Sequence, residues 1–104
     1  MAQAKATVGE SLEFWPDYGP GPLWRGGSPA ELGVLGLSGD LAERLKMFND
    51  AYEEERLPLD GAGDAEYLTA GMGLLAEVRQ ALSGRFRVIV TEPWWGEQPS
   101  DYER

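Results

Sequence analysis

Residues 85–92, Arg-Phe-Arg-Val-Ile-Val-Thr-Glu, carry the clearest strand pattern in this chain. Apolar side chains recur at every second position, at Phe86, Val88 and Val90, as in a strand with one buried face. Pro93 then ends the strand, because proline has no N–H to donate to a neighbouring strand. The partners of this strand come from elsewhere in the chain or from a second copy of it.

The segment before this strand is predicted to be a helix. Asp64 can accept a hydrogen bond from the first turn, and Gly84 suits the left-handed residue that follows a helix. Gly71 and Gly73 lie inside the helix, where glycine is unfavourable. Close packing would explain Gly71, and nothing in the sequence explains Gly73. The positions of the buried stripe have helical spacing: Leu68, Met72, Leu75, Val78 or Arg79, and Leu82.

An earlier helix is expected over residues 39–56, ending before Pro58. Ser38 is its predicted N-cap, and Asp40 can pair with Arg44 one turn later. Its buried positions are spaced by four, three and four residues, the period of an amphipathic helix. They are Leu41, Leu45, Phe48 and Tyr52.

Residues 11–15 alternate like a second strand, with Leu12 and Phe14 on one face. The glycine- and proline-rich connection 16–38 follows, and Leu23-Trp24 can add a short strand. The expected fold class is α+β in the order β-(loop)-α-α-β. A small two- or three-stranded sheet is covered on one face by two antiparallel helices.

A two-stranded sheet is marginal alone, so either the loop adds a third strand or two chains share a sheet as a homodimer. The chain has 104 residues, which fits one domain. We expect a flexible arm at 1–9, a single α+β domain at 10–96 and an acidic tail at 97–104.

The composition excludes several chemistries. There is no histidine and no cysteine, so the usual zinc ligands, the cysteine nucleophile and the serine–histidine pair are missing. No cofactor and no metal are expected. The absence of disulfides, of a secretory signal and of a long apolar run fits a cytoplasmic protein without a membrane partner. The net charge of −9 disfavours nucleic acid. It fits either a basic protein partner or a role in solubility alone, and both readings stay open.

Two aromatic segments, 14–24 and 91–97, contain all four tryptophans. Tryptophan and tyrosine combine a large apolar area with a polar group, the profile of residues at the centre of binding surfaces. They can equally form an aromatic lid that completes the core, so both readings stay open. The candidate binding residues are Trp15, Asp17, Tyr18, Trp24, Glu92, Trp94 and Trp95.

The direction of the first strand decides whether these segments meet. In a parallel pair both segments leave the same end of the sheet and can form one pocket. In an antiparallel pair they lie at opposite ends. The connection 16–38 is long enough for either arrangement, and we favour the antiparallel one slightly.

The motifs Trp15-Pro16-Asp17-Tyr18-Gly19, Leu35-Gly36-Leu37-Ser38 and Tyr52-Glu53 resemble those of a family of small bacterial proteins, common in actinobacteria, with no established activity. The resemblance covers residues 12–96. It implies the same order of strands and helices and no mechanism.

The leading hypothesis is a non-enzymatic, acidic protein-interaction module that masks a basic partner, as immunity proteins and antitoxins do. The alternative is a small-ligand-binding protein or a carboxylate-dependent enzyme. In that case Asp17, Tyr18 and Glu92 would line an aromatic pocket.

Overall fold

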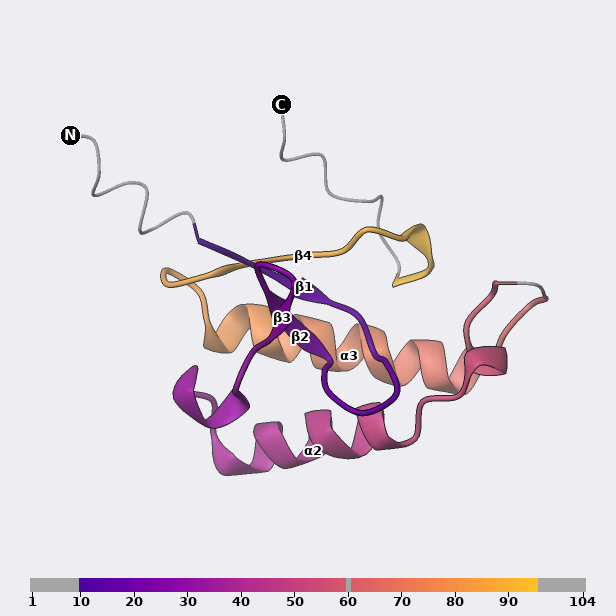
Figure 1. The fold of residues 1–104 in the computed structure, drawn as a ribbon, viewed down its shortest axis with the longest axis horizontal. Coiled ribbons are helices and arrows are strands. Elements are labelled where there is room, and N and C mark those ends of the chain that lie inside the picture. The colour runs from indigo at the N-terminus through magenta and orange to yellow at the C-terminus, as the bar shows by residue number, and fades with distance from the viewer. Residues whose placement is uncertain (1–9, 60, 96–104) are drawn as a thin grey trace.

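The computed structural model describes residues 10–59 and 61–95, which form the predicted α+β fold (Figure 1). The expected arm at 1–9 and tail at 97–104 lie outside the described residues. The elements in chain order are β1 (Ser11–Phe14), β2 (Leu23–Arg25), β3 (Ser28–Pro29), η1 (Leu32–Val34), α2 (Gly39–Asp50), η2 (Glu54–Arg56), α3 (Ala65–Ala81), β4 (Arg87–Ile89) and η3 (Pro93–Trp95).

The described residues form a four-stranded sheet in the order β3-β2-β1-β4, so the loop adds two strands rather than the one expected. β1 and β2 are antiparallel, whereas β1 and β4 are parallel. The preference for an antiparallel first strand was therefore wrong. The reason is visible in Figure 1: α2 runs away from the end where β1 begins, and antiparallel α3 returns the chain to that end.

The helix boundaries follow from their caps. Ser38 Oγ accepts a hydrogen bond from the Leu41 N–H, and Asp64 caps α3, both as predicted. Helix α2 ends at Asp50 rather than near residue 56. Three successive glutamates at 53–55 would face the negative end of the helix dipole, which disfavours a longer helix. Within the described ranges, no helix has the length and apolar run needed to cross a membrane.

The core lies between one face of the sheet and both helices. Phe14 of β1 contacts Phe48 of α2 at a ring-centroid distance of 5.9 Å and Trp95 of η3 at 5.1 Å. A Cβ added at Gly71 would lie 2.5 Å from Trp95 and 2.9 Å from Phe48, which explains this helical glycine. A Cβ at Gly73 would meet nothing within 4 Å, and nothing in the structure explains Gly73.

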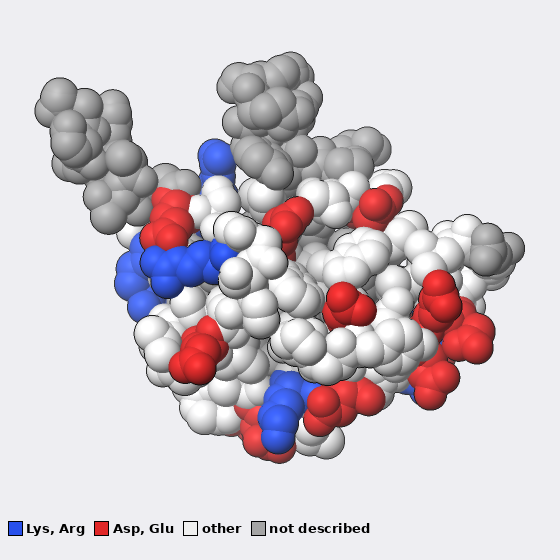
Figure 2. Space-filling model, viewed as in Figure 1, with Lys and Arg blue, Asp and Glu red and all other residues white. Residues whose placement is uncertain are grey.

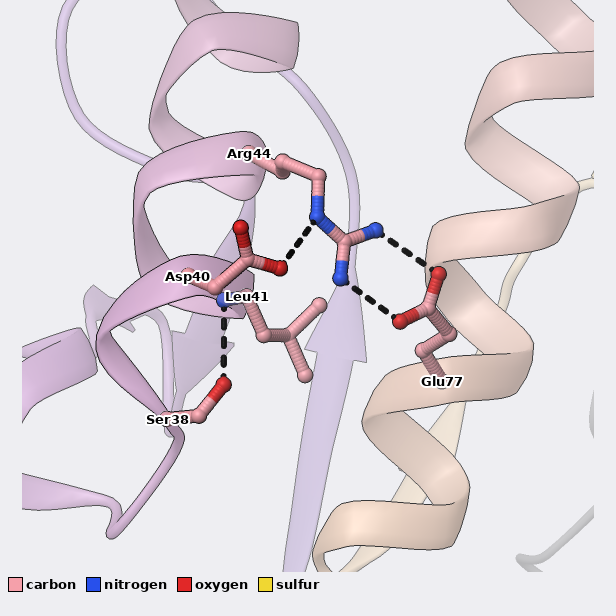
Figure 3. Close-up of polar contacts among 5 residues, drawn as sticks. All are labelled: Ser38, Asp40, Leu41, Arg44 and Glu77. Atoms are coloured by element: carbon pink, nitrogen blue, oxygen red, sulfur yellow. Dashed lines mark hydrogen bonds and ion pairs between the residues drawn. The ribbon is translucent and has the colours of Figure 1, made fainter.

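A surface ion-pair network links the two helices (Figure 3). Arg44 bonds Asp40 one turn earlier, as predicted, and also bonds both carboxylate oxygens of Glu77 at 2.8 Å. The hydrogen bonds from Arg44 hold the pKa of Glu77 below its ordinary value. All three side chains are partly or largely exposed, so the network stabilises the fold only slightly.

The free side of β4 is covered by an arginine of α3. The Arg87 N–H donates to the Glu10 carbonyl beside β1. Because successive residues of a strand direct their polar groups to opposite sides, the Val88 carbonyl points away from β1. That carbonyl accepts hydrogen bonds from Arg79 Nε at 3.1 Å and from Arg79 Nη2 at 2.8 Å.

Candidate functional site

The candidate site lies on the face of the sheet that is turned away from the helices. Glu13 alternates with the buried residues of β1, and the register pairs it with Trp24 on one side and Ile89 on the other. Paired residues share a face of a sheet, so these three form one row across β2, β1 and β4. Ile89 is buried but does not belong to the main core cluster, in keeping with its position on this outer face.

A hollow of about 390 Å³ opens beside this row, and we call it the aromatic–carboxylate hollow. It lies where the carboxyl ends of the parallel strands β1 and β4 meet. The parallel pairing therefore joins the two aromatic segments in one site, which the favoured antiparallel arrangement would have prevented. The lining residues are Glu13, Trp15, Asp17, Trp24, Gly27, Thr91 and Glu92.

The two tryptophan walls are held in place by contacts within the fold. Trp24 Nε1 donates to the Trp15 carbonyl at 2.7 Å, and the Trp15 N–H donates to the Pro22 carbonyl at 2.7 Å. The Trp15 ring also packs against the Trp94 ring, with centroids 5.7 Å apart. Both walls are half-buried, so each keeps some exposed surface.

A buried asparagine of α2 holds the loop that carries Asp17. Asn49 is only 4% exposed. Its Oδ1 accepts from the Asp17 N–H at 2.9 Å, and its Nδ2 donates to the Gly19 carbonyl at 2.8 Å. Gly21 has φ +125°, and a Cβ there would lie 2.9 Å from Asn49 Oδ1. The close approach of loop and helix therefore depends on this glycine.

Within residues 10–59 and 61–95, the carboxylates of the hollow have no cationic partner. Among the described residues, the ion pairs of the protein involve Glu10, Asp40, Asp64 and Glu77, and none involves Glu13, Asp17 or Glu92. Asp17 Oδ1 accepts a hydrogen bond from the adjacent Tyr18 N–H. Within the described part of the chain, no group of three potential ligands could hold a metal ion.

Tyr18 does not join the hollow, although it was a candidate residue. Its side chain is 61% exposed, and its ring packs edge-on against Tyr52 at 4.7 Å. Its hydroxyl accepts a hydrogen bond from the Glu54 N–H. Tyr18 thus ties the loop to the chain segment that follows α2.

The adjacent tryptophans of η3 differ in position. Trp95 is 2% exposed and belongs to the core, so the reading of an aromatic lid holds for it. Trp94 is half-buried behind Trp15. Each indole N–H is buried without a hydrogen-bond partner in the described structure. Glu13 was not among the candidate residues, although its alternation with Leu12 and Phe14 placed it on the side of Trp15.

A second hollow, a groove of about 540 Å³, lies between α2 and α3. Its rim includes Met47, which is 60% exposed. The charged groups at this rim largely compensate one another, because Arg44 pairs with Glu77 and Arg56 faces Asp64 at 3.8 Å. This groove has less capacity for a charged guest than the aromatic–carboxylate hollow.

No family model, no curated protein and no solved structure matches this chain. The resemblance to small actinobacterial proteins therefore stays a prediction, and the functional argument depends on the site alone.

Proposed function

We propose that this chain is a small acidic protein-interaction module that binds a basic protein partner through the aromatic–carboxylate hollow. One observation carries the proposal: Glu13, Asp17 and Glu92 meet at a tryptophan-walled hollow without a basic partner among the described residues. Carboxylates held near one another without a cation attract one from outside. Masking a basic partner in the cytoplasm, in the manner of an immunity protein or antitoxin, is the role that this chemistry fits.

The wider surface supports the proposal. The net charge is −9, and Figure 2 shows acidic side chains across the visible face, gathered at the end where η2 lies in Figure 1. Glu53, Glu54 and Glu55 are exposed there. Such a field accelerates the encounter with a basic partner, and the rigid hollow then provides a defined point of attachment.

The test uses a defined basic peptide that contains both lysine and arginine, and an acidic peptide of the same length. The ¹⁵N-labelled full chain is titrated with each peptide at about 20 mM and about 150 mM salt, where screening shortens to about 8 Å. We expect only the basic peptide to bind, with amide shifts at Glu13, Asp17 and Glu92, and weaker binding at the higher salt.

Glu92→Gln and Glu43→Gln form a matched pair of variants for this titration. Both remove one negative charge, but Glu43 is exposed on α2, away from the hollow. Glu92→Gln should weaken binding about fivefold, and Glu43→Gln by less than twofold. Equal effects of the two changes, or no binding at low salt, would contradict the proposal.

A second candidate is a small-ligand site, because the parallel strands bring Asp17 and Glu92 to one hollow of a volume typical of small-ligand pockets. Tyr18, the third residue expected in such a site, is engaged with Tyr52 instead. Tighter binding of small organic cations than of the basic peptide would favour this candidate.

A further inference from the structure

This protein already holds an arginine between an aromatic ring and a carboxylate beside the sheet. The Arg25 guanidinium carbon lies 5.4 Å from the centre of the Phe86 ring, and its Nε bonds Glu10. The bond to Glu10 raises the pKa of Arg25 and lowers the pKa of Glu10. The ring attracts the cation through its negative face, and the carboxylate attracts it through charge.

The same arrangement recurs in a second part of the fold. The Arg56 guanidinium carbon lies 5.2 Å from the centre of the Tyr67 ring, and its Nε is 3.8 Å from Asp64 Oδ2. Two separate parts of the fold therefore place a guanidinium group against one aromatic face and one carboxylate.

The aromatic–carboxylate hollow offers these two elements, and its lining in the described part of the chain contains no arginine. Trp15 and Trp24 line it, and indole binds cations better than the rings of phenylalanine or tyrosine. Glu13, Asp17 and Glu92 come from three positions around it, and no lysine or arginine is among its described lining residues. Compared with the Arg25 and Arg56 sites, the hollow has a stronger aromatic element, more carboxylates and no cation among the described residues that line it.

We propose that the hollow binds the guanidinium group of an arginine side chain presented by the basic partner. This inference rests on the proposed function and specifies which group of the partner enters the site. A guanidinium group is planar, stacks on aromatic faces, and presents five donors that can meet carboxylates on more than one side. The ammonium group of lysine is a compact, strongly hydrated charge and gains less from flat walls.

The hollow is formed before a guest arrives. Trp24 is fixed by its bond to the Trp15 carbonyl, Trp15 is backed by Trp94, and Asn49 holds the backbone of Asp17. Binding therefore costs little additional ordering of the site. The volume of about 390 Å³ is near the lower end of the range for ligand sites, which suits one side chain rather than a large ligand.

The experiment titrates the ¹⁵N-labelled full chain with N-acetyl-arginine amide, N-acetyl-lysine amide and N-acetyl-citrulline amide. Citrulline has the shape of arginine without its charge, so it separates stacking from cation binding. The readout is the indole N–H signals of Trp15 and Trp24, assigned with Trp15→Phe and Trp24→Phe. We expect saturable shifts with arginine at a dissociation constant on the order of millimolar, weaker binding of lysine, and none of citrulline.

Glu13→Gln and Glu92→Gln should each weaken arginine binding about fivefold, and Glu43→Gln should leave it unchanged. A short peptide with several arginines should bind more tightly than the same peptide with lysines, at the same two indole signals. Tighter binding of the arginine peptide than of N-acetyl-arginine amide would assign the guest to a partner protein rather than to a free small molecule.

Three results would overturn the inference. Equal binding of the arginine and lysine peptides would remove the guanidinium preference, yet leave the proposed function intact. Binding of basic peptides that leaves the signals of Trp15 and Trp24 unmoved would overturn the inference and also the hollow as the binding site of the proposed function. Failure of all basic peptides to bind would remove both proposals together.

Discussion

The two faces of the sheet use aromatic residues in opposite ways. On the inner face, Phe14 and Trp95 are closed in by Phe48 and by the backbone of α3 at Gly71. On the outer face, tryptophans stay half-buried and stand beside carboxylates. The adjacent residues Trp94 and Trp95 differ in this respect: Trp95 belongs to the core, and Trp94 packs against Trp15 of the outer face. The aromatic content of a segment therefore says little about function until the backbone assigns each ring to a face.

The largest expected effect is a difference in stability between variants that lack a tryptophan of the inner face and variants that lack one of the outer face. Trp95→Ala should lower the free energy of unfolding by about 3–5 kcal/mol, because it leaves a cavity among Phe14, Phe48 and Gly71. Trp24→Ala should lower the free energy of unfolding by clearly less, because the Trp24 ring is half-buried and lines the hollow rather than the core. Urea unfolding followed by circular dichroism measures both. A Trp24→Ala variant as unstable as Trp95→Ala would show that the outer face also functions as core.

Two glycines of α3 sharpen the comparison with changes of opposite sign. Gly71→Ala adds a methyl group between Trp95 and Phe48 and should destabilise the protein by about 1–3 kcal/mol. Gly73→Ala points into open space and should stabilise it by about 1 kcal/mol, the difference in helix propensity. The midpoints of thermal unfolding should move in opposite directions. A loss of stability in Gly73→Ala would mean that the exposed side of α3 is constrained by a contact that the structure does not contain.

The smallest expected effect is a pH dependence of the free energy of unfolding that comes from the buried tyrosine Tyr67. Burial raises the pKa of Tyr67, against the opposing effect of nearby Arg56, and the Tyr67 hydroxyl donates to the buried Phe48 carbonyl. The unfolded state loses its tyrosine proton near pH 10, before the folded state does, so stability falls as the pH rises above about 10.

Tyr67→Phe should therefore flatten the alkaline decline, while Tyr52, whose pKa is also raised by burial, keeps part of it. The measurement is the midpoint of urea unfolding of both proteins between pH 8 and pH 11. At neutral pH, Tyr67→Phe should lower the free energy of unfolding by about 1 kcal/mol, because it removes the hydrogen bond to the Phe48 carbonyl. An unchanged alkaline slope in Tyr67→Phe would count against a buried, neutral Tyr67.

The sequence predicted the parts of the fold that local chemistry determines. Ser38, Asp64 and Gly84 mark helix ends, and the alternation around Phe14 marks β1. It did not predict β3, whose two residues include a proline, or the end of α2 before Tyr52. The direction of β1 was beyond local patterns, because it depends on where the helices return the chain.

The same division holds for the site. Trp15, Asp17, Trp24 and Glu92 were singled out by residue type, and the parallel pairing of β1 with β4 brings them together. Tyr18 and Trp95 have the same residue chemistry, but packing against Tyr52 and the core directs them elsewhere. Glu13 was missed because a lone charged residue in a strand is usually only a solvated position.

The two hydrogen bonds from Arg79 to the Val88 carbonyl also bear on how copies of this protein behave at high concentration. β4 is an edge strand of the described sheet, and an uncovered edge is a template on which a strand of another molecule can add. Arg79 occupies the acceptor that such an incoming strand needs and places a positive charge in its path. Arg79 thereby disfavours edge-to-edge pairing of sheets from two molecules. A dimer that shares a sheet through β4 would first have to displace the Arg79 side chain.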